Sequence, residues 1–295
     1  MATMTLPPIV EARINYFPPD GPRIFYPGTA GYQRRVFDTQ TIQVNDTREA
    51  QEDLTLDKCG FQVVHNDWTP IDPDGDPEHI RKVVYSETID FLKKLTGATE
   101  VIPFSNLVRK DTAEQVSQSG EGLNDSDPLP AAGPTRFAHC DNSTKGALTV
   151  LEAVAPDAER RMKSRWAIMN VWRGIRTVTR DPLGMLHAQS VTDSELIGVF
   201  SAFPQKGSKG AFGGAYEAGE GFETAQVKAG QGHRWYYCSN MQPHETLVFK
   251  QYDSKLDGRA TRTPHSAFQT KHDSGLPRQS IEVRNLVFWD GESPE

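Results

Sequence analysis

The sequence contains few cysteines and no long apolar run. Its 295 residues include three cysteines, Cys59, Cys140 and Cys238, which lie far apart and form no CxxC pair. They cannot build a disulfide framework, and they suit a reducing compartment. The chain never reaches the roughly 18 consecutive apolar residues of a membrane span, and its first residues do not resemble a secretory signal. We therefore expect a cytoplasmic protein that does not bind membranes.

Basic residues are not in excess either. The chain has 32 Lys and Arg against 39 Asp and Glu, a net charge of −7, and no basic stripe. Nucleic acid is therefore not an expected partner. The sequence also lacks a GxGxxG or P-loop motif, and the glycines of 207–222 match neither phosphate-binding pattern. These absences favour a loop-rich globular protein that acts on a small molecule. A homodimer is a further expectation.

The first 110 residues predict an N-terminal wrap around a core. Residues 1–45 are rich in Pro, Gly and aromatics, which indicates an extended arm, and 46–57 have helical composition. The clearest helix covers 76–96, because Asp76-Pro77 is a good N-terminus and Gly97 ends the apolar periodicity.

Residues 111–295 predict the core. Residues 112–134 indicate a loop that would act as a lid, and 145–163 a second helix. Short runs rich in β-branched and aromatic residues follow without intervening helices, which favours an antiparallel sandwich or barrel. These runs are 166–172, 232–239, 245–252, 265–270 and 280–289.

His139-Cys140-Asp141 is the first candidate for chemistry. On an extended strand, residues i and i+2 project from the same face, so His139 and Asp141 would reach one point. Two histidines and one carboxylate on one side of a metal are the ligands of non-haem Fe(II) oxygenases. Alone, an HxD pair is weak evidence, because a hydrogen-bonded histidine beside a turn aspartate is the commoner explanation.

The stretch 263–289 strengthens this interpretation. His265 lies on one predicted strand, and Arg278-Gln279-Ser280 opens the next. Antiparallel pairing of these strands would bring Arg278 and Ser280 near the histidine. A guanidinium and a hydroxyl could then bind the far carboxylate of a ligand that chelates the metal.

The HxD, distant His and RxS pattern is similar to that of Fe(II)/2-oxoglutarate-dependent oxygenases. Four blocks, 171–191, 233–254, 263–270 and 277–288, resemble the fungal hydroxylase/desaturase family of AsaB-like proteins, gibberellin desaturase and CmcJ. The resemblance implies a mainly β fold, a double-stranded β-helix (jelly roll) with flanking helices and an N-terminal extension. In that fold the two histidine strands lie side by side in the smaller sheet.

By this resemblance His139, Asp141 and His265 bind Fe(II), and Arg278 and Ser280 bind 2-oxoglutarate. The implied reaction is O2-dependent hydroxylation or desaturation of an unactivated C–H bond in a small secondary metabolite, with release of succinate and CO2. Because ligands at 139 and 265 must converge on one metal, we expect residues 1–295 to form one oxygenase domain.

Two residues compete for these roles. His244 could replace His265, but His265 stands 13 positions before Arg278 and His244 stands 34. Arg284 shares a strand face with Arg278, although a salt bridge with Glu282 or another acid is its simpler role.

Trp172 and Arg173 are further candidates on the cofactor side of the pocket, with core packing and a surface charge as equally good explanations. Three other functions stay open. These are an Fe(II) oxidase without 2-oxoglutarate, of the isopenicillin N synthase type, a zinc hydrolase that uses the same triad, and a binding protein without catalysis.

Overall fold

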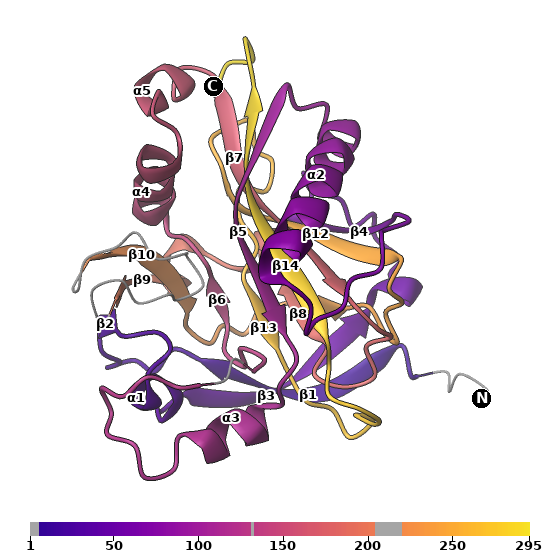
Figure 1. Cartoon of the computed structure of the whole chain (residues 1–295), viewed down its shortest axis with the longest axis vertical. Coiled ribbons are helices and arrows are strands. Elements are labelled where there is room, and N and C mark those ends of the chain that lie inside the picture. Colours follow the sequence, from indigo (N-terminus) through magenta and orange to yellow (C-terminus); the bar gives the residue numbers. More distant parts are fainter. Residues whose placement is uncertain (1–5, 131–132, 204–219) are drawn as a thin grey trace.

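The computed structural model describes residues 6–130, 133–203 and 220–295. Within these residues two curled sheets face each other (Figure 1). The larger sheet has nine strands, in the spatial order β1 (Ile9–Tyr16), β3 (Asp38–Asp46), β11 (Trp235–Tyr237), β8 (Leu183–Leu186), β13 (His265–Ala267), β6 (His139–Cys140), β10 (Gly221–Val227), β9 (Leu196–Ala202) and β2 (Ile24–Phe25). The smaller has five, in the order β4 (Phe61–His65), β12 (Glu245–Asp253), β7 (Arg165–Gly174), β14 (Ser280–Trp289) and β5 (Glu100–Arg109).

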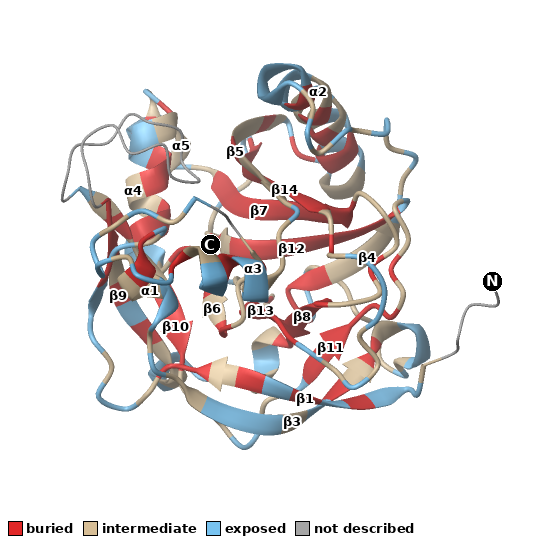
Figure 2. Cartoon of the chain, turned by 60° about the horizontal axis from the view of Figure 1, so that its bottom comes forward, coloured by how far each residue is buried: buried red, intermediate tan, exposed pale blue. Residues whose placement is uncertain are grey.

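Apolar side chains from both sheets meet in the space between them. Trp172 and Phe249 of the smaller sheet pack in one buried cluster with Met185 and Tyr236 of the larger sheet. Figure 2 shows that the strands on both sides of this core are mostly buried. Successive residues of a strand point to opposite faces, so the neighbours of these residues, such as Arg173, face outward.

The N-terminal arm is itself β structure. Strands β1 and β3 form a long antiparallel hairpin, and β3 pairs in parallel with β11. The hairpin curls over the larger sheet, where Ile14 and Tyr16 pack against Trp235 and Tyr237. The predicted arm therefore forms two strands at one edge of the larger sheet, and its apolar side chains pack against that sheet's core.

Strand pairing corrects two expectations. His139 and His265 do lie side by side, because β6 pairs with β13 in that register. They belong to the larger sheet, however, since the N-terminal hairpin extends it. The predicted pairing of the His265 strand with the Ser280 strand is wrong: β13 and β14 lie in opposite sheets, and β14 pairs with β5 and β7.

The helices flank the two sheets. They are α1 (Ala30–Gln33), α2 (Pro77–Thr96), α3 (Ala113–Ser119), α4 (Thr144–Val154) and α5 (Ala158–Arg161), with 3-10 turns at Thr47–Glu49, Ala188–Ser190 and Asp193–Glu195. Helix α2 packs Phe91 and Leu92 on the outer face of the smaller sheet. Within the described ranges, no helix combines the length and apolar character needed to cross a bilayer.

Helix α2 confirms the prediction for 76–96. The side chain of Asp76 accepts hydrogen bonds from two backbone N–H groups of the first turn, and Gly97 ends the helix with a φ of 70°. The predicted helix over 46–57 is wrong. The segment instead begins with a 3-10 turn at Thr47–Glu49, where Arg48 makes a two-pronged ion pair with Glu245 that holds it against β12.

Two other predicted segments also differ from the structure. The predicted helix 145–163 divides into α4 and α5, because Pro156 has no N–H to continue the first helix. The predicted loop 112–134 contains α3, begun by a capping box between Thr112 and Gln115, and its role as a lid stays a prediction. Residues 131–132, and 207–219 of the glycine-rich stretch, lie outside the described residues.

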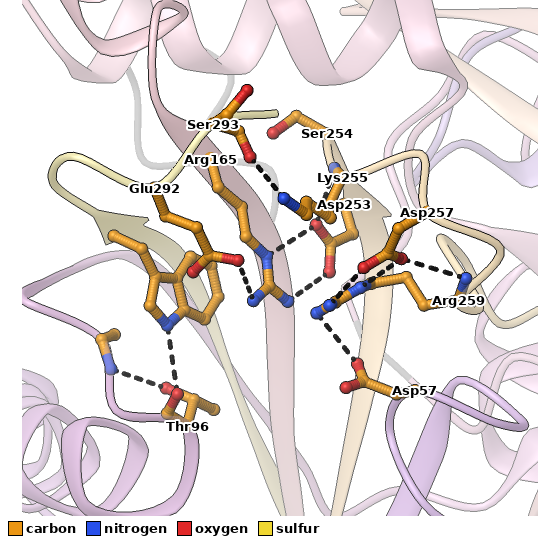
Figure 3. A network of polar contacts seen from close by, with 12 residues as sticks. Asp57, Thr96, Arg165, Asp253, Ser254, Lys255, Asp257, Arg259, Glu292 and Ser293 are labelled. Carbon is orange, nitrogen blue, oxygen red and sulfur yellow. Dashed lines mark hydrogen bonds and ion pairs between the residues drawn. The ribbon is translucent and has the colours of Figure 1, made fainter. Parts of the chain in front are cut away.

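A buried ion network fixes the outer face of the smaller sheet at one end. Arg165 of β7 donates to both oxygens of Asp253, at 3.2 and 2.8 Å, and contacts Glu292 (Figure 3). Lys250 donates to the same aspartate at 2.8 Å, and to Asp57. The side chains of Lys250 and Asp253 are 1% and 0% exposed, so the contacts of Asp253 that link β7 and β12 are shielded from solvent.

Candidate metal centre and its surroundings

Two short neighbouring strands bring the predicted ligands together. His139 and His265 are directly opposite each other on β6 and β13, with ring centroids 4.4 Å apart. Asp141 follows β6, and its Oδ1 lies 3.4 Å from Nε2 of His139 and 3.9 Å from Nε2 of His265. The ligand atoms of the three residues all lie within 4.8 Å of one another. One metal ion could contact all three.

Both imidazoles are oriented with Nε2 toward this point. Nδ1 of His139 donates to the carbonyl oxygen of Phe137 at 2.9 Å, which leaves Nε2 free to act as a ligand. His265 is buried, and burial, followed by the electrostatic effect of His139, lowers its pKa to about 3. It is therefore neutral at physiological pH, as a metal ligand must be.

Asp141 is ionised despite its burial. Burial alone would raise its pKa, but the Arg284 guanidinium and the two histidines hold the pKa well below its ordinary value. Oδ2 accepts from Nε of Arg284 at 2.7 Å and from Nδ2 of Asn170 at 2.8 Å. The backbone N–H of Asp141 donates to Oε1 of Gln251 at 2.7 Å. The carboxylate is thus held from the side opposite the histidines.

Arg278 and Ser280 face the interior at the start of β14. Ser280, Glu282 and Arg284 alternate along this strand, and Glu282 and Arg284 contact the residues around Asp141, so Ser280 shares their face. Arg278 precedes Ser280 by two positions, is 4% exposed, and donates to the carbonyl oxygen of Asp181. Burial, and then the charge of Arg109, lower its pKa to about 10, so it stays a cation at neutral pH.

Two polar atoms of this pair have no partner. Among the described residues, Nε of Arg278 and Oγ of Ser280 are buried and make no hydrogen bond. Buried polar atoms are nearly always paired, so these two atoms are available for hydrogen bonds to a ligand.

The structure separates Trp172 from Arg173. Trp172 points between the sheets, and the Arg278 guanidinium lies 5.3 Å from the centre of its ring. Arg173 points outward, where it donates to the carbonyl oxygen of Thr69 and lies over Trp68. Trp172 therefore lies beside the predicted 2-oxoglutarate anchor, whereas Arg173 lies on the other face of the sheet.

His244 and Arg284, the rivals of His265 and Arg278, have other contacts in the structure. His244 is exposed and packs against His65, away from the three ligands. Arg284 makes the expected ion pair with Glu282, at 3.4 Å, and a shorter one with Asp141.

Sequence reasoning missed Asn170, Gln251 and Arg109. Asn170 interrupts the apolar run of β7, and a polar residue in a buried strand must find a partner, which is the signal that could have identified it. Arg109 lies opposite Ser280 on β5, and its guanidinium donates to Gly133 and to Oγ1 of Thr135 at 3.0 Å. It holds the segment that leads to His139.

The chain is similar in sequence to a known family of oxidoreductases. A family model described as "Oxidoreductase/YMDC permease-like domain" matches residues 14–288. The chain belongs to this oxidoreductase family. Members named as hydroxylase/desaturase include efuI of Hormonema carpetanum, 37% identical over 98% of each chain, and CTB9 of Cercospora beticola, 35% identical over 98% of this chain and 89% of the relative. The family resemblance seen in the sequence is confirmed.

A further relative and a solved structure extend the comparison. The family member phiK, from a fungal species, is named an alpha-ketoglutarate-dependent dioxygenase and is 34% identical over 95% of this chain and 96% of its own. The iron and alpha-ketoglutarate-dependent endoperoxidase NvfI superposes with a TM-score of 0.76 at 22% identity, covering 97% of this chain and 99% of that one. This likeness confirms the predicted jelly-roll fold.

Proposed function

We propose that this family member is an Fe(II)- and 2-oxoglutarate-dependent dioxygenase that hydroxylates or desaturates an unactivated C–H bond of a small natural product. One observation carries the proposal. His139, Asp141 and His265 converge between the same two sheets in which Arg278 and Ser280 present unpartnered polar atoms. The names of the relatives support the same cofactors.

The residues present fit both cofactors. Two imidazoles and one carboxylate on one side of a metal leave the opposite positions open, which suits Fe(II) and a chelating keto acid. His139, Asp141 and His265 would hold the metal, and it would supply the activation of O2. Arg278 and Ser280 would bind the distal carboxylate, and the cation would stay charged throughout turnover.

The protein's own contribution is position and exclusion of water. Trp172 and Phe249 line the interior beside these groups, and Phe249 lies 4.8 Å from the His265 ring. An apolar wall keeps the ligands in one geometry and limits side reactions with solvent. Succinate and CO2 would leave as co-products, with a hydroxylated or desaturated substrate.

The test is anaerobic addition of Fe(II) and 2-oxoglutarate. We expect a weak visible charge-transfer band, which His265→Ala abolishes and Arg278→Ala weakens. A parent protein without this band would contradict the proposal. Succinate release coupled to substrate turnover separates it from a 2-oxoglutarate-independent oxidase, and O2 uptake with metal analysis separates it from a zinc hydrolase.

The setting of the reaction is also part of the proposal. The three cysteines are free and buried, which supports a cytoplasmic, reducing compartment. The partners are a small-molecule substrate and O2. One oxygenase domain over residues 1–295 and a homodimer both stay predictions.

A further inference from the structure

The two oxygens of Asp141 have different surroundings. Oδ2 receives two hydrogen bonds, from Nε of Arg284 at 2.7 Å and from Nδ2 of Asn170 at 2.8 Å. Each carboxylate oxygen has about two acceptor positions, so these donors occupy Oδ2. Oδ1 instead faces the Nε2 atoms of His139 and His265. One oxygen is held by protein donors, and the other points at the metal position.

The two donors are themselves fixed by a third residue. Asn170 and Arg284 lie directly opposite each other on β7 and β14, so their side chains meet on the inner face. Glu282 accepts from Nδ2 of Asn170 and lies 3.4 Å from Nη2 of Arg284. Asn170, Glu282 and Arg284 are 0%, 7% and 5% exposed, so water does not compete for these bonds. We call these three residues the carboxylate clamp.

We propose that the carboxylate clamp is a positioning device that restricts Asp141 to one-oxygen coordination through Oδ1. This inference rests on the proposed function, because it assumes that the triad binds a metal. A second bond from Oδ2 would occupy a position that the keto acid or O2 needs. The clamp prevents it, because Oδ2 would have to leave a guanidinium and an amide. Asn170 and Arg284 contact Asp141 directly, and Glu282 contacts both of them, so the clamp acts through Asp141.

The test measures binding of Co(II) to the full-length protein, with Asn170→Leu and Arg284→Gln as the main variants. Loss of one outer contact to a metal ligand typically costs 10- to 100-fold in metal affinity, and we expect the Kd for Co(II) to rise by about that factor. The visible ligand-field spectrum of bound Co(II) should also change, because Oδ2 becomes free to coordinate. Reduced stability alone does not change this spectrum in the molecules that remain folded. Arg284→Lys keeps the charge and should restore part of the affinity.

Arg165→Gln is the matched control. Arg165 is also a buried arginine of a β7–β14 pair and is ion-paired to an aspartate (Figure 3), but strand alternation puts it on the outer face of the sheet. The Arg165→Gln substitution should lower the free energy of unfolding and leave the Kd for Co(II) and the Co(II) spectrum unchanged. Wild-type affinity and spectrum in both Asn170→Leu and Arg284→Gln would overturn the inference while the metal site stands. If the parent binds no Co(II), or His265→Ala binds it equally well, the proposed metal site itself is wrong.

Discussion

Replacing Arg278 by methionine should weaken 2-oxoglutarate binding while leaving the metal ligands intact. Methionine retains an apolar stem beside Trp172, so the change removes mainly the cation. A hydrogen bond to a charged group contributes about 1.5–3 kcal/mol, and Nε is the Arg278 atom left without a partner among the described residues, so loss of its ligand bond costs about that much. Since 1.4 kcal/mol is tenfold, the Kd for 2-oxoglutarate should rise by roughly 10- to 100-fold.

The assay is anaerobic titration of 2-oxoglutarate into the Fe(II)-loaded protein, followed by the visible charge-transfer band. Ser280→Ala removes one neutral hydroxyl, worth about 1 kcal/mol, and should weaken binding only about fivefold. Arg173→Met is the matched control, because Arg173 is a buried arginine whose pKa burial also lowers to about 10, but it faces away from the site. Equal losses in Arg173→Met and Arg278→Met, or none in Arg278→Met, would refute the reasoning.

Three further outcomes concern stability. Asp253→Asn weakens the buried pairing of Arg165 and Lys250 and should lower the free energy of unfolding by about 3 kcal/mol in urea titration. Burial alone would raise the pKa of Asp253, but Arg165 and Lys250 hold it below its ordinary value of 3.8. The stabilising effect of the Asp253 carboxylate is therefore present above about pH 4 and lost as the pH falls further. The difference in Tm between the parent and Asp253→Asn should narrow below about pH 4. A difference in Tm that stays constant with pH would contradict this. Gly146→Ala should destabilise α4 against β10 in thermal melts, despite alanine's helix propensity, because the new Cβ would meet the Glu223 carbonyl oxygen at 1.8 Å.

The juxtaposition of His139 and Asp141 was predictable because its signal is local, whereas His265 was assigned to the site through the family resemblance. An HxD on an extended strand shares one face by backbone geometry alone, and the structure brings His139 and Asp141 to one point, with His265 on the neighbouring strand. The length of α2 was predictable for the same reason, since Asp76 and Gly97 define its ends.

Other features depend on contacts between distant parts of the chain. The helix predicted over 46–57 does not form, because Arg48 of this segment pairs with the distant Glu245. No local sequence pattern indicates that ion pair. The sheet that contains β14 follows from its pairing with β5, about 180 positions earlier in the sequence. Asn170 and Arg284 meet Asp141 only after three strands are in register, so their role could not be read from spacing.

The most direct test of the central claim is a crystal structure of the Fe(II)-soaked protein with anomalous diffraction at the iron edge. The account predicts one iron peak within bonding distance of Nε2 of His139, Oδ1 of Asp141 and Nε2 of His265, with Oδ2 still bound to Arg284 and Asn170. An iron peak elsewhere, or none at this triad under saturating Fe(II), would contradict it.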